Sequence, residues 1–463
     1  MSLAKADISK IWGKGKLKAL FAPVDNATII LFRMMFGGIM FWEVTRYFKY
    51  DWITKYWIAP KFNFSYTPFN FQPLEGDGMI IIWYILGVLA LCIFLGLFYR
   101  VSISLFFLIF TYTFLLDQAR YLNHFYLICL ISFFMIFIPA SRAFSLDSLF
   151  FKKKRSNVNA AWNLWLIRFL IGLPYFFGGI AKINPDWLRG YPMHLWLGRQ
   201  IDFPIIGKFF TDEWMIQLMS FSGLLLDLAI VPLLLFKRTR IWGFIIIISF
   251  HLLNSELFII GIFPWFMIAA TTLFFAPDWP KTLITKLSSG NINLPILTKD
   301  EIKNNFPYHK KTIIALAICS GILVITPFRH ILIKANVHWT EEGDRYAWRM
   351  KLIEKYGNAI LLVKNKQNGQ VSQIKNGDYL ADWQISAMGG NPILIWKFTQ
   401  IVKNDFKLKG EDVQIFVVAK ASLNGREFEP IIDPNIDFSN AEMKVFGHDN
   451  WILPSTIPLK NQR

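Results

Sequence analysis

Lys182 stands where a long apolar run ends, in the stretch YFFGGIAKINPDWLRGY at 175–191. A lysine at such a position has two possible roles. It can anchor a membrane helix by extending its ammonium group to the lipid headgroups, or it can act as a base in a dry pocket. Burial penalises the charged form of an amine, so a desolvated lysine can serve as a general base near neutral pH. The residues alone leave both roles open.

The apolar run before Lys182 carries polar residues on one helix face. Arg168, Tyr175 and Lys182 recur every seven residues and therefore share a face. Gly178 and Gly179 lie one turn before the lysine, where they allow a neighbouring helix or a flat ligand to approach the backbone closely.

Two further polar clusters come from distant parts of the chain. Asn123 and His124 begin one apolar run, whereas His251 and Asn254 lie three residues apart on one face of another, with Glu256 just beyond. Two histidines and a carboxylate invite a zinc or iron site. No two of them have the spacing of a ligand pair on one helix and no cysteine is near, so we expect no metal. The ordinary alternative for each histidine is a hydrogen-bonded position in the core.

Arg168 is expected to form a structural ion pair, because a charged side chain inside a membrane span is costly unless it is paired. Asp227 and Glu43 are candidate partners, and the sequence does not choose between them. The chain shows no glycine-rich phosphate loop and no Ser-His-Asp set at a recognisable spacing.

Composition predicts the elements that must position these residues. The 463 residues are 54% hydrophobic and 17% charged, against about 25% charged in an average globular protein. The formal charge of +17 could indicate nucleic-acid binding, but residues 329–463 hold 18 Lys and Arg against 15 Asp and Glu. The excess therefore lies in short loops between apolar runs, where it sets topology, and we expect no nucleic-acid partner.

Apolar runs long enough to cross a bilayer recur along the chain, since a spanning helix needs about 20 residues. Nine spans are predicted at 27–47, 78–98, 101–118, 124–140, 160–181, 218–236, 241–254, 257–277 and 311–328. The runs 101–140 and 241–277 are each divided because DQARYLNH and FHLLNSEL hold the polar groups of a turn or a buried site. The predicted fold is mainly α, with a polytopic membrane bundle at 1–328 and a mixed, β-rich domain at 329–463.

Loop charges predict the orientation of the bundle. The N-terminal segment is predicted to be cytoplasmic because of Lys5, Lys10, Lys14, Lys16 and Lys18. Alternation puts four further basic segments on that side, namely Arg100, 152–155, 237–240 and 281–311. The C-terminal domain then lies outside the cytoplasm. Lys182 and the corners at 117–124 and 251–256 share one depth in the outer half of the bilayer.

The C-terminal domain shows hairpin and helix signals. Asn368-Gly369 and Asn424-Gly425 each join two β-like runs, and Asn-Gly is the strongest short hairpin signal. The stretch PILIWKFTQIVKNDF from residue 392 has helical spacing. We expect this domain to pack over the outer mouth of the bundle.

At these clusters the sequence resembles the vitamin K-dependent γ-glutamyl carboxylases and the wider superfamily of horizontally transferred transmembrane (HTTM) domains. The matching strings in the bundle are GLFYRVS, FLLDQARYLNHFYL, YFFGGIAKINPDWLRGYPM, LLLDLAIVPLLLF, FHLLNSELFIIGIF and FFAPDWP. In the C-terminal domain they are VHWTEEGDRYAWRMKL, LNGREFEPIIDPNIDF and DNWILP. The resemblance covers about residues 20 to 460.

The resemblance implies a coupled reaction. In the family a lysine deprotonates vitamin K hydroquinone, which reacts with O2 to give a strong base and leaves as the epoxide. That base removes a γ-proton from a peptide glutamate, and the carbanion adds CO2. Lys182 matches the initiating lysine, and His124 matches a histidine that assists it.

The resemblance also suggests the binding residues. The quinol site would comprise Asn123 and Asn254, which orient its oxygen, and His251 in the hydrogen-bonding network, with Tyr175, Gly178 and Gly179. The glutamate entrance would be lined by Trp339, Tyr346, Trp348 and Met350. The alternative for this last group is ordinary packing of an aromatic-rich domain.

The expected cofactor is vitamin K hydroquinone, either phylloquinol or a menaquinol, with O2 and CO2. The expected partner is a glutamate-containing peptide or an exported protein. The compact length favours a bacterial inner membrane, with the endoplasmic reticulum as the alternative.

Two other functions compete with carboxylation. One is a quinol epoxidase of the same fold that does not carboxylate glutamate. The other is a transporter or receptor, although the inverted repeats common in transporters are not seen.

Overall fold

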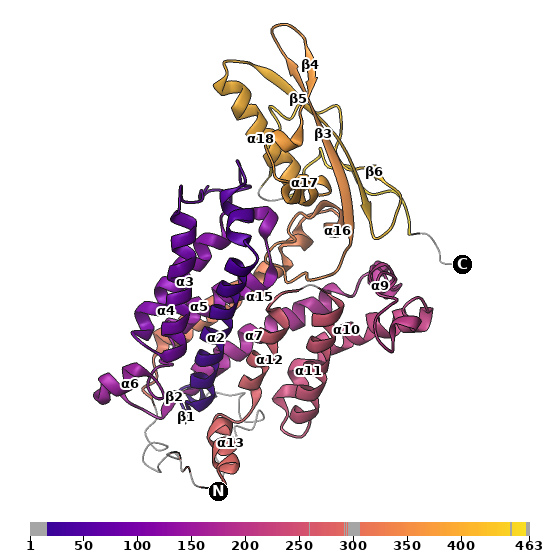
Figure 1. The fold of residues 1–463 in the computed structure, drawn as a ribbon. Coiled ribbons are helices and arrows are strands. Elements are labelled where there is room, and N and C mark those ends of the chain that lie inside the picture. Colours follow the sequence, from indigo (N-terminus) through magenta and orange to yellow (C-terminus); the bar gives the residue numbers. More distant parts are fainter. Residues whose placement is uncertain are drawn as a thin grey trace.

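The structure is a computed structural model that describes residues 16–258, 260–290, 292, 294, 306–444 and 447–459. Helices form an elongated bundle, and a smaller domain of strands and helices covers one end of it (Figure 1). Lys5, Lys10 and Lys14, and much of the basic segment 281–311, lie outside the described residues.

Each of the nine predicted spans coincides with an apolar helix among the described residues. Six are long enough to cross a membrane: α2 (Ala27–Lys49), α3 (Gly78–Leu95), α7 (Ala161–Ala181), α10 (Glu213–Leu235), α11 (Arg240–Leu257) and α15 (Lys310–Ile325), which continues as a 3-10 helix to Leu332. Three are shorter: α4 (Tyr99–Phe114), α5 (Asn123–Met135) and α12 (Phe263–Thr271), which continues to Phe274. The predicted membrane bundle is confirmed.

Several predicted helix ends were wrong; the fourth span, for example, was predicted to end at residue 140, whereas α5 ends at Met135. The break between the second and third spans comes earlier than predicted, because α3 ends at Leu95 and Gly96 takes the left-handed conformation (φ +64°) that closes the helix. The stretch FHLLNSEL is helical, since α11 continues to Leu257 and the turn follows at 258–262. Its polar residues therefore belong to a helix face.

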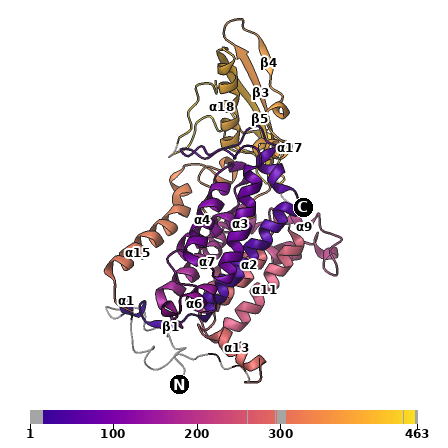
Figure 2. The same ribbon diagram turned by 60° about the vertical axis from the view of Figure 1, so that its left-hand side comes forward.

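Short elements connect the long helices. They are α1 (Lys16–Ala19), β1 (Pro23–Asp25), α6 (Leu146–Phe150), β2 (Val158–Ala160), α8 (Pro185–Leu188), α9 (Met193–Leu197), α13 (Trp279–Leu287) and α16 (Val337–Thr340). Strands β1 and β2 pair antiparallel. These two strands, α6 and α13 lie at the end of the bundle opposite the C-terminal domain (Figures 1 and 2).

The C-terminal domain is one antiparallel sheet with two helices. Its strand order is β4-β3-β5-β6, formed by β3 (Lys355–Asn365), β4 (Val371–Gln373), β5 (Val413–Leu423) and β6 (Glu429–Pro430), and its helices are α17 (Asp382–Gly389) and α18 (Pro392–Leu408). Both predicted hairpins and the predicted helix are confirmed. Gly369, Asn424 and Gly425 have φ values of +72°, +52° and +78°, as tight hairpin turns require.

Close contact between α2 and α3 depends on one glycine. A Cβ atom at Gly37 would lie 2.5 Å from the backbone nitrogen of Phe94 and 2.7 Å from the carbonyl oxygen of Ala90. The next residue, Gly38, faces only the Phe94 ring, at 3.6 Å. Alanine substitutions at these two neighbouring glycines therefore provide a test of the helix contact and its control.

We expect Gly37→Ala to destabilise the bundle by about 1–3 kcal/mol, because the methyl group meets rigid backbone and forces the helices apart. Gly38→Ala should be neutral or slightly stabilising, since alanine is the better helix former. Thermal unfolding in detergent compares the two variants. Equal melting temperatures would contradict the packing inferred here.

Candidate active site

A cavity of about 570 Å³ lies at the junction of the bundle and the C-terminal domain. Side chains from six apolar helices, from the segments that connect these helices and from residues 349–351 line it. Seven of the predicted catalytic and binding residues are among them: Asn123, His124, Tyr175, Lys182, His251, Asn254 and Met350. Clusters far apart in the sequence therefore meet at one place.

Lys182 follows α7 directly and its Nζ is hydrogen-bonded to Oδ2 of Asp227 on α10. Both residues are buried, with 8% and 6% of their surfaces exposed. The ammonium group also lies 5.3 Å from the ring centroid of Trp187. A paired, enclosed lysine of this kind does not extend to the headgroups, so the geometry does not support the anchoring role.

Gly178 and Gly179 make this pairing possible. A Cβ atom at Gly178 would lie 3.1 Å from Oδ2 of Asp227, and one at Gly179 would lie 2.7 Å from Cδ2 of Leu228. Neither glycine lines the cavity. Of the two uses predicted for them, the structure shows close approach of a neighbouring helix, α10.

Hydrogen bonding differs between the two histidines of the cavity. The Tyr175 hydroxyl is 2.8 Å from Nε2 of His251, whose Nδ1 has no partner among the described residues. His124 packs its ring against Phe263, with centroids 5.8 Å apart. No hydrogen bond joins the His124 ring to another residue in the described part of the chain, so its nitrogens are available to a ligand.

Asn123 joins the bundle to the C-terminal segment. Its Oδ1 accepts a hydrogen bond from the Tyr121 hydroxyl at 3.0 Å, and its Nδ2 is 3.3 Å from the carbonyl oxygen of Arg349. The Tyr121 hydroxyl in turn accepts the Tyr346 amide at 2.7 Å. Trp348 packs on Tyr126, with ring centroids 4.9 Å apart. Residues 346–349 are thereby held over the start of α5.

Only Met350 of the four predicted entrance residues lines the cavity. Trp339 is buried in the core of the C-terminal domain, where its Nε1 donates to the carbonyl of Leu453 at 2.7 Å. Tyr346 and Trp348 pack against the bundle core instead. The aromatic rings of Tyr346 and Trp348 hold the segment that carries Met350.

Several lining residues were not identified from the sequence. They are chiefly charged or aromatic: Arg46, Arg120, Trp187, Trp196, Arg349 and Lys351. The lone carboxylate in LLLDLAIVPLLL was a usable signal for Asp227, but only folding shows its partner. Within the described residues, no three His, Cys, Asp or Glu side chains cluster closely enough to hold a metal ion.

The ion pair expected for Arg168 was wrong. Its Nε and Nη2 donate to the carbonyl oxygens of Leu273 and Phe275 at 2.8 and 2.9 Å. These carbonyls end the α12 segment, where helices leave acceptors unpaired. Arg168 therefore satisfies a helix end, while Asp227 pairs with Lys182 and Glu43 with Arg46.

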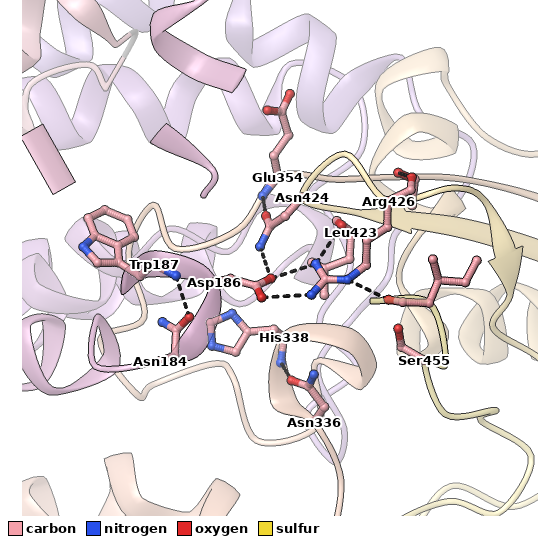
Figure 3. A network of polar contacts seen from close by, with 12 residues as sticks. Asn184, Asp186, Trp187, Asn336, His338, Glu354, Leu423, Asn424, Arg426 and Ser455 are labelled. Atoms are coloured by element: carbon pink, nitrogen blue, oxygen red, sulfur yellow. Dashed lines mark hydrogen bonds and ion pairs between the residues drawn. The ribbon is translucent and has the colours of Figure 1, made fainter. Parts of the chain in front are cut away.

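A polar joint fixes the C-terminal domain four residues beyond Lys182 (Figure 3). Asp186 accepts hydrogen bonds from Nη1 and Nη2 of Arg426 at 2.8 and 2.9 Å and from Nδ2 of Asn424 at 2.7 Å. Oδ1 of Asn424 also accepts the Glu354 amide at 2.9 Å. The β5–β6 turn is thus attached to α8.

Electrostatics favour this joint. Burial alone would raise the pKa of Asp186, but the hydrogen bonds from Arg426 and Asn424 outweigh it and hold the pKa below its ordinary value. A depressed carboxyl pKa adds stability that is present above the ordinary pKa and is lost as the pH falls through the lowered value. The joint is therefore complete across the neutral range.

Fold and site together define a multi-pass membrane protein whose cavity, with a buried Lys–Asp pair, is closed by a second domain. The HTTM domain matches residues 21–279, and the lumenal domain of vitamin K-dependent gamma-carboxylase matches residues 308–457. The chain belongs to the vitamin K-dependent gamma-carboxylase family. No solved structure matches it.

We expect Asp186→Asn to loosen the C-terminal domain, because it replaces charge-assisted hydrogen bonds to Arg426 with neutral ones. Backbone amides at 353–357 should exchange hydrogen about tenfold faster, in line with the worth of such bonds.

Asp412→Asn is the matched control, since the Lys366–Asp412 pair is exposed, at 38% and 71% of the side-chain surfaces, and such pairs contribute little. Unchanged exchange in Asp186→Asn, or equal acceleration in both variants, would contradict the joint.

Proposed function

We propose that this protein is a vitamin K-dependent γ-glutamyl carboxylase. It converts vitamin K hydroquinone, O2, CO2 and a peptide glutamate into vitamin K epoxide, water and γ-carboxyglutamate. The observation that carries the proposal is the buried Lys182–Asp227 pair in a cavity formed by both family domains. A peptide from the aqueous side and a lipid-soluble quinol can both reach such a junction.

The cavity fits the proposed quinol. About 570 Å³ is enough for a small-ligand site, and aromatic side chains including Phe250, Phe258 and Phe263 provide apolar walls. His124 and Nδ1 of His251 lack protein partners among the described residues and can bind a hydroxyl group. When bound, the quinol supplies, through its oxidation by O2, a base strong enough to remove a γ-proton.

The Lys182–Asp227 pair would take up the proton that starts the reaction. The pair is neutral overall, whether the shared proton lies on the amine or on the carboxylate. In either form it can accept one proton from a hydroxyl donor, ending as an ammonium beside a carboxylic acid. Because both side chains are buried, competition from water for that proton is limited.

Other residues would orient the reactants. His124 and Asn254 line the cavity on different helices and would position the quinol oxygens, while Tyr175 fixes the ring of His251. Asn123 is already bonded to Tyr121 and to the backbone of Arg349. We therefore assign Asn123 the role of holding the peptide-side segment rather than the quinol.

We also propose that the basic, N-terminal end of the bundle faces the cytoplasm and that the C-terminal domain lies outside it, where exported proteins are the substrates. The rival quinol epoxidase would use the same pair and cavity but would not need the segment at 346–351 to enter the site. Met350 lines the cavity from that segment, which favours the carboxylase.

Lys182→Ala should abolish both products. Purified protein is supplied with reduced vitamin K, O2, labelled bicarbonate and a short glutamate peptide, and epoxide and labelled peptide are measured together. We expect a loss of about a hundredfold or more in each, because an acid–base group contributes roughly 10²–10⁴-fold. Lys208→Ala, at an exposed lysine of the α9–α10 connection, is the control and should retain both.

The same assay decides between the functions. Epoxide without labelled peptide in the wild type would favour the epoxidase. Neither product from well-folded wild-type protein would contradict the proposal and favour a binding or transport role.

Asp227→Asn tests the partner of the lysine. The variant keeps the size of the side chain but removes the proton-accepting carboxylate, so epoxide formation should fall about tenfold or more. Both products should fall in parallel, since the first proton transfer precedes both. Retention of wild-type rates by Asp227→Asn would show that the carboxylate has no part in the reaction.

A further inference from the structure

The cavity is positively charged. Five basic side chains line it, Arg46, Arg120, Lys182, Arg349 and Lys351, against two carboxylates, Glu43 and Asp227. A lining of this sign favours an anionic ligand.

Most of these cations already have charged partners. Arg46 pairs with Glu43 at 2.6 Å, and Lys182 with Asp227. Arg349 contacts Asp344 at 3.3 Å, and it is also bonded to the ring of His338. Two basic side chains of the lining, Arg120 and Lys351, have no such partner among the described residues.

Arg120 and Lys351 form no ion pair with a described residue. Arg120 donates to the Tyr47 hydroxyl at 3.1 Å and its guanidinium lies 3.5 Å from the Tyr56 ring centroid. It is held beneath aromatic rings in the bundle. Lys351 belongs to the C-terminal segment and its side chain is exposed.

Two rings from the bundle side hold the Lys351 ammonium in the cavity. It lies 5.8 Å from the ring centroid of Trp196 and 5.7 Å from that of Phe258, within the range of cation–π attraction. Burial lowers the pKa of Lys351 below its ordinary value, and the nearby charge of Glu354 offsets this only in part. An anion bound at this amine would favour its charged form further.

Three residues of the segment 346–351 have a strained backbone conformation. Tyr346, Trp348 and Lys351 have φ values of +63°, +58° and +49°, which residues other than glycine seldom adopt. Such conformations cluster at functional sites when the surroundings hold them. Here the aromatic packing of Tyr346 and Trp348 holds the chain so that residues 349–351 face the cavity.

We propose that the Lys351 ammonium binds the γ-carboxylate of the substrate glutamate. The proposal rests on the proposed carboxylase function and names the group that selects the substrate. Met350, next to it, also lines the cavity and offers an apolar surface to the glutamate methylenes.

The pairing would serve the chemistry as well as binding. Removal of a γ-proton adds negative charge next to a carboxylate, and a cation at that carboxylate stabilises the developing charge. A glutamine side chain has the same shape but no charge, so Lys351 would also discriminate against it.

The test compares Lys351→Met, Lys351→Arg and the wild type in the carboxylation assay. Lys351→Met removes the charge, and we expect KM for the glutamate peptide to rise about tenfold or more, the effect typical of a lost bond to a charged group. Lys351→Arg keeps the charge and should recover most of the loss. Lys420→Met, at an exposed lysine on β5, is the matched control and should leave KM unchanged.

A second readout separates charge from packing. An identical peptide with glutamine in place of glutamate is used as a competitive inhibitor. In the wild type its Ki should exceed the KM of the glutamate peptide, and in Lys351→Met the two values should converge.

The outcomes distinguish the two proposals. A wild-type enzyme that carboxylates the peptide, with unchanged KM in Lys351→Met, would overturn this inference alone. A raised KM with the same preference for glutamate over glutamine would also overturn it, because the loss would then come from packing. Failure of the wild type to label any peptide would overturn the proposed function itself.

Discussion

A charge placed at the depth of lipid must find a partner, and the rest of this site depends on how that requirement is met. Lys182 lies at the end of α7, and Asp227 on α10 is the carboxylate that compensates it. Gly178 and Gly179 let α10 approach closely at this pair. Neutralising the charge of Lys182 thus requires close contact between α7 and α10 beside the cavity.

The cavity is completed from outside the bundle. Residues 349–351 line it, and the segment that carries them is held by Tyr121, Asn123 and Tyr126. The Asp186–Arg426 joint fixes the same domain a few residues beyond Lys182. The reaction that we propose, between a lipid-soluble donor and a water-soluble peptide, needs a site of this kind, in which each domain supplies one face.

Some charged side chains of the bundle hold the structure, and others remain for ligands. Arg168 satisfies carbonyl groups at a helix end, outside the cavity lining, and Arg46 is paired within its own helix. Arg120 and Lys351 form no ion pair within the described residues and lie on different domains. The positive lining therefore results from the few cations that structural pairing leaves over.

Nine apolar helices, both Asn-Gly hairpins and the family could be predicted from the residues alone, because apolar run length and turn chemistry are local properties. The sequence also identified Lys182 and His124 as residues that could do chemistry. The folded chain was needed to show that Asp227 pairs with Lys182, that Trp339 is buried in a core, and that Lys351 lines the cavity. Partner choice depends on which helix faces meet, and the sequence carries no local record of contacts between residues so far apart.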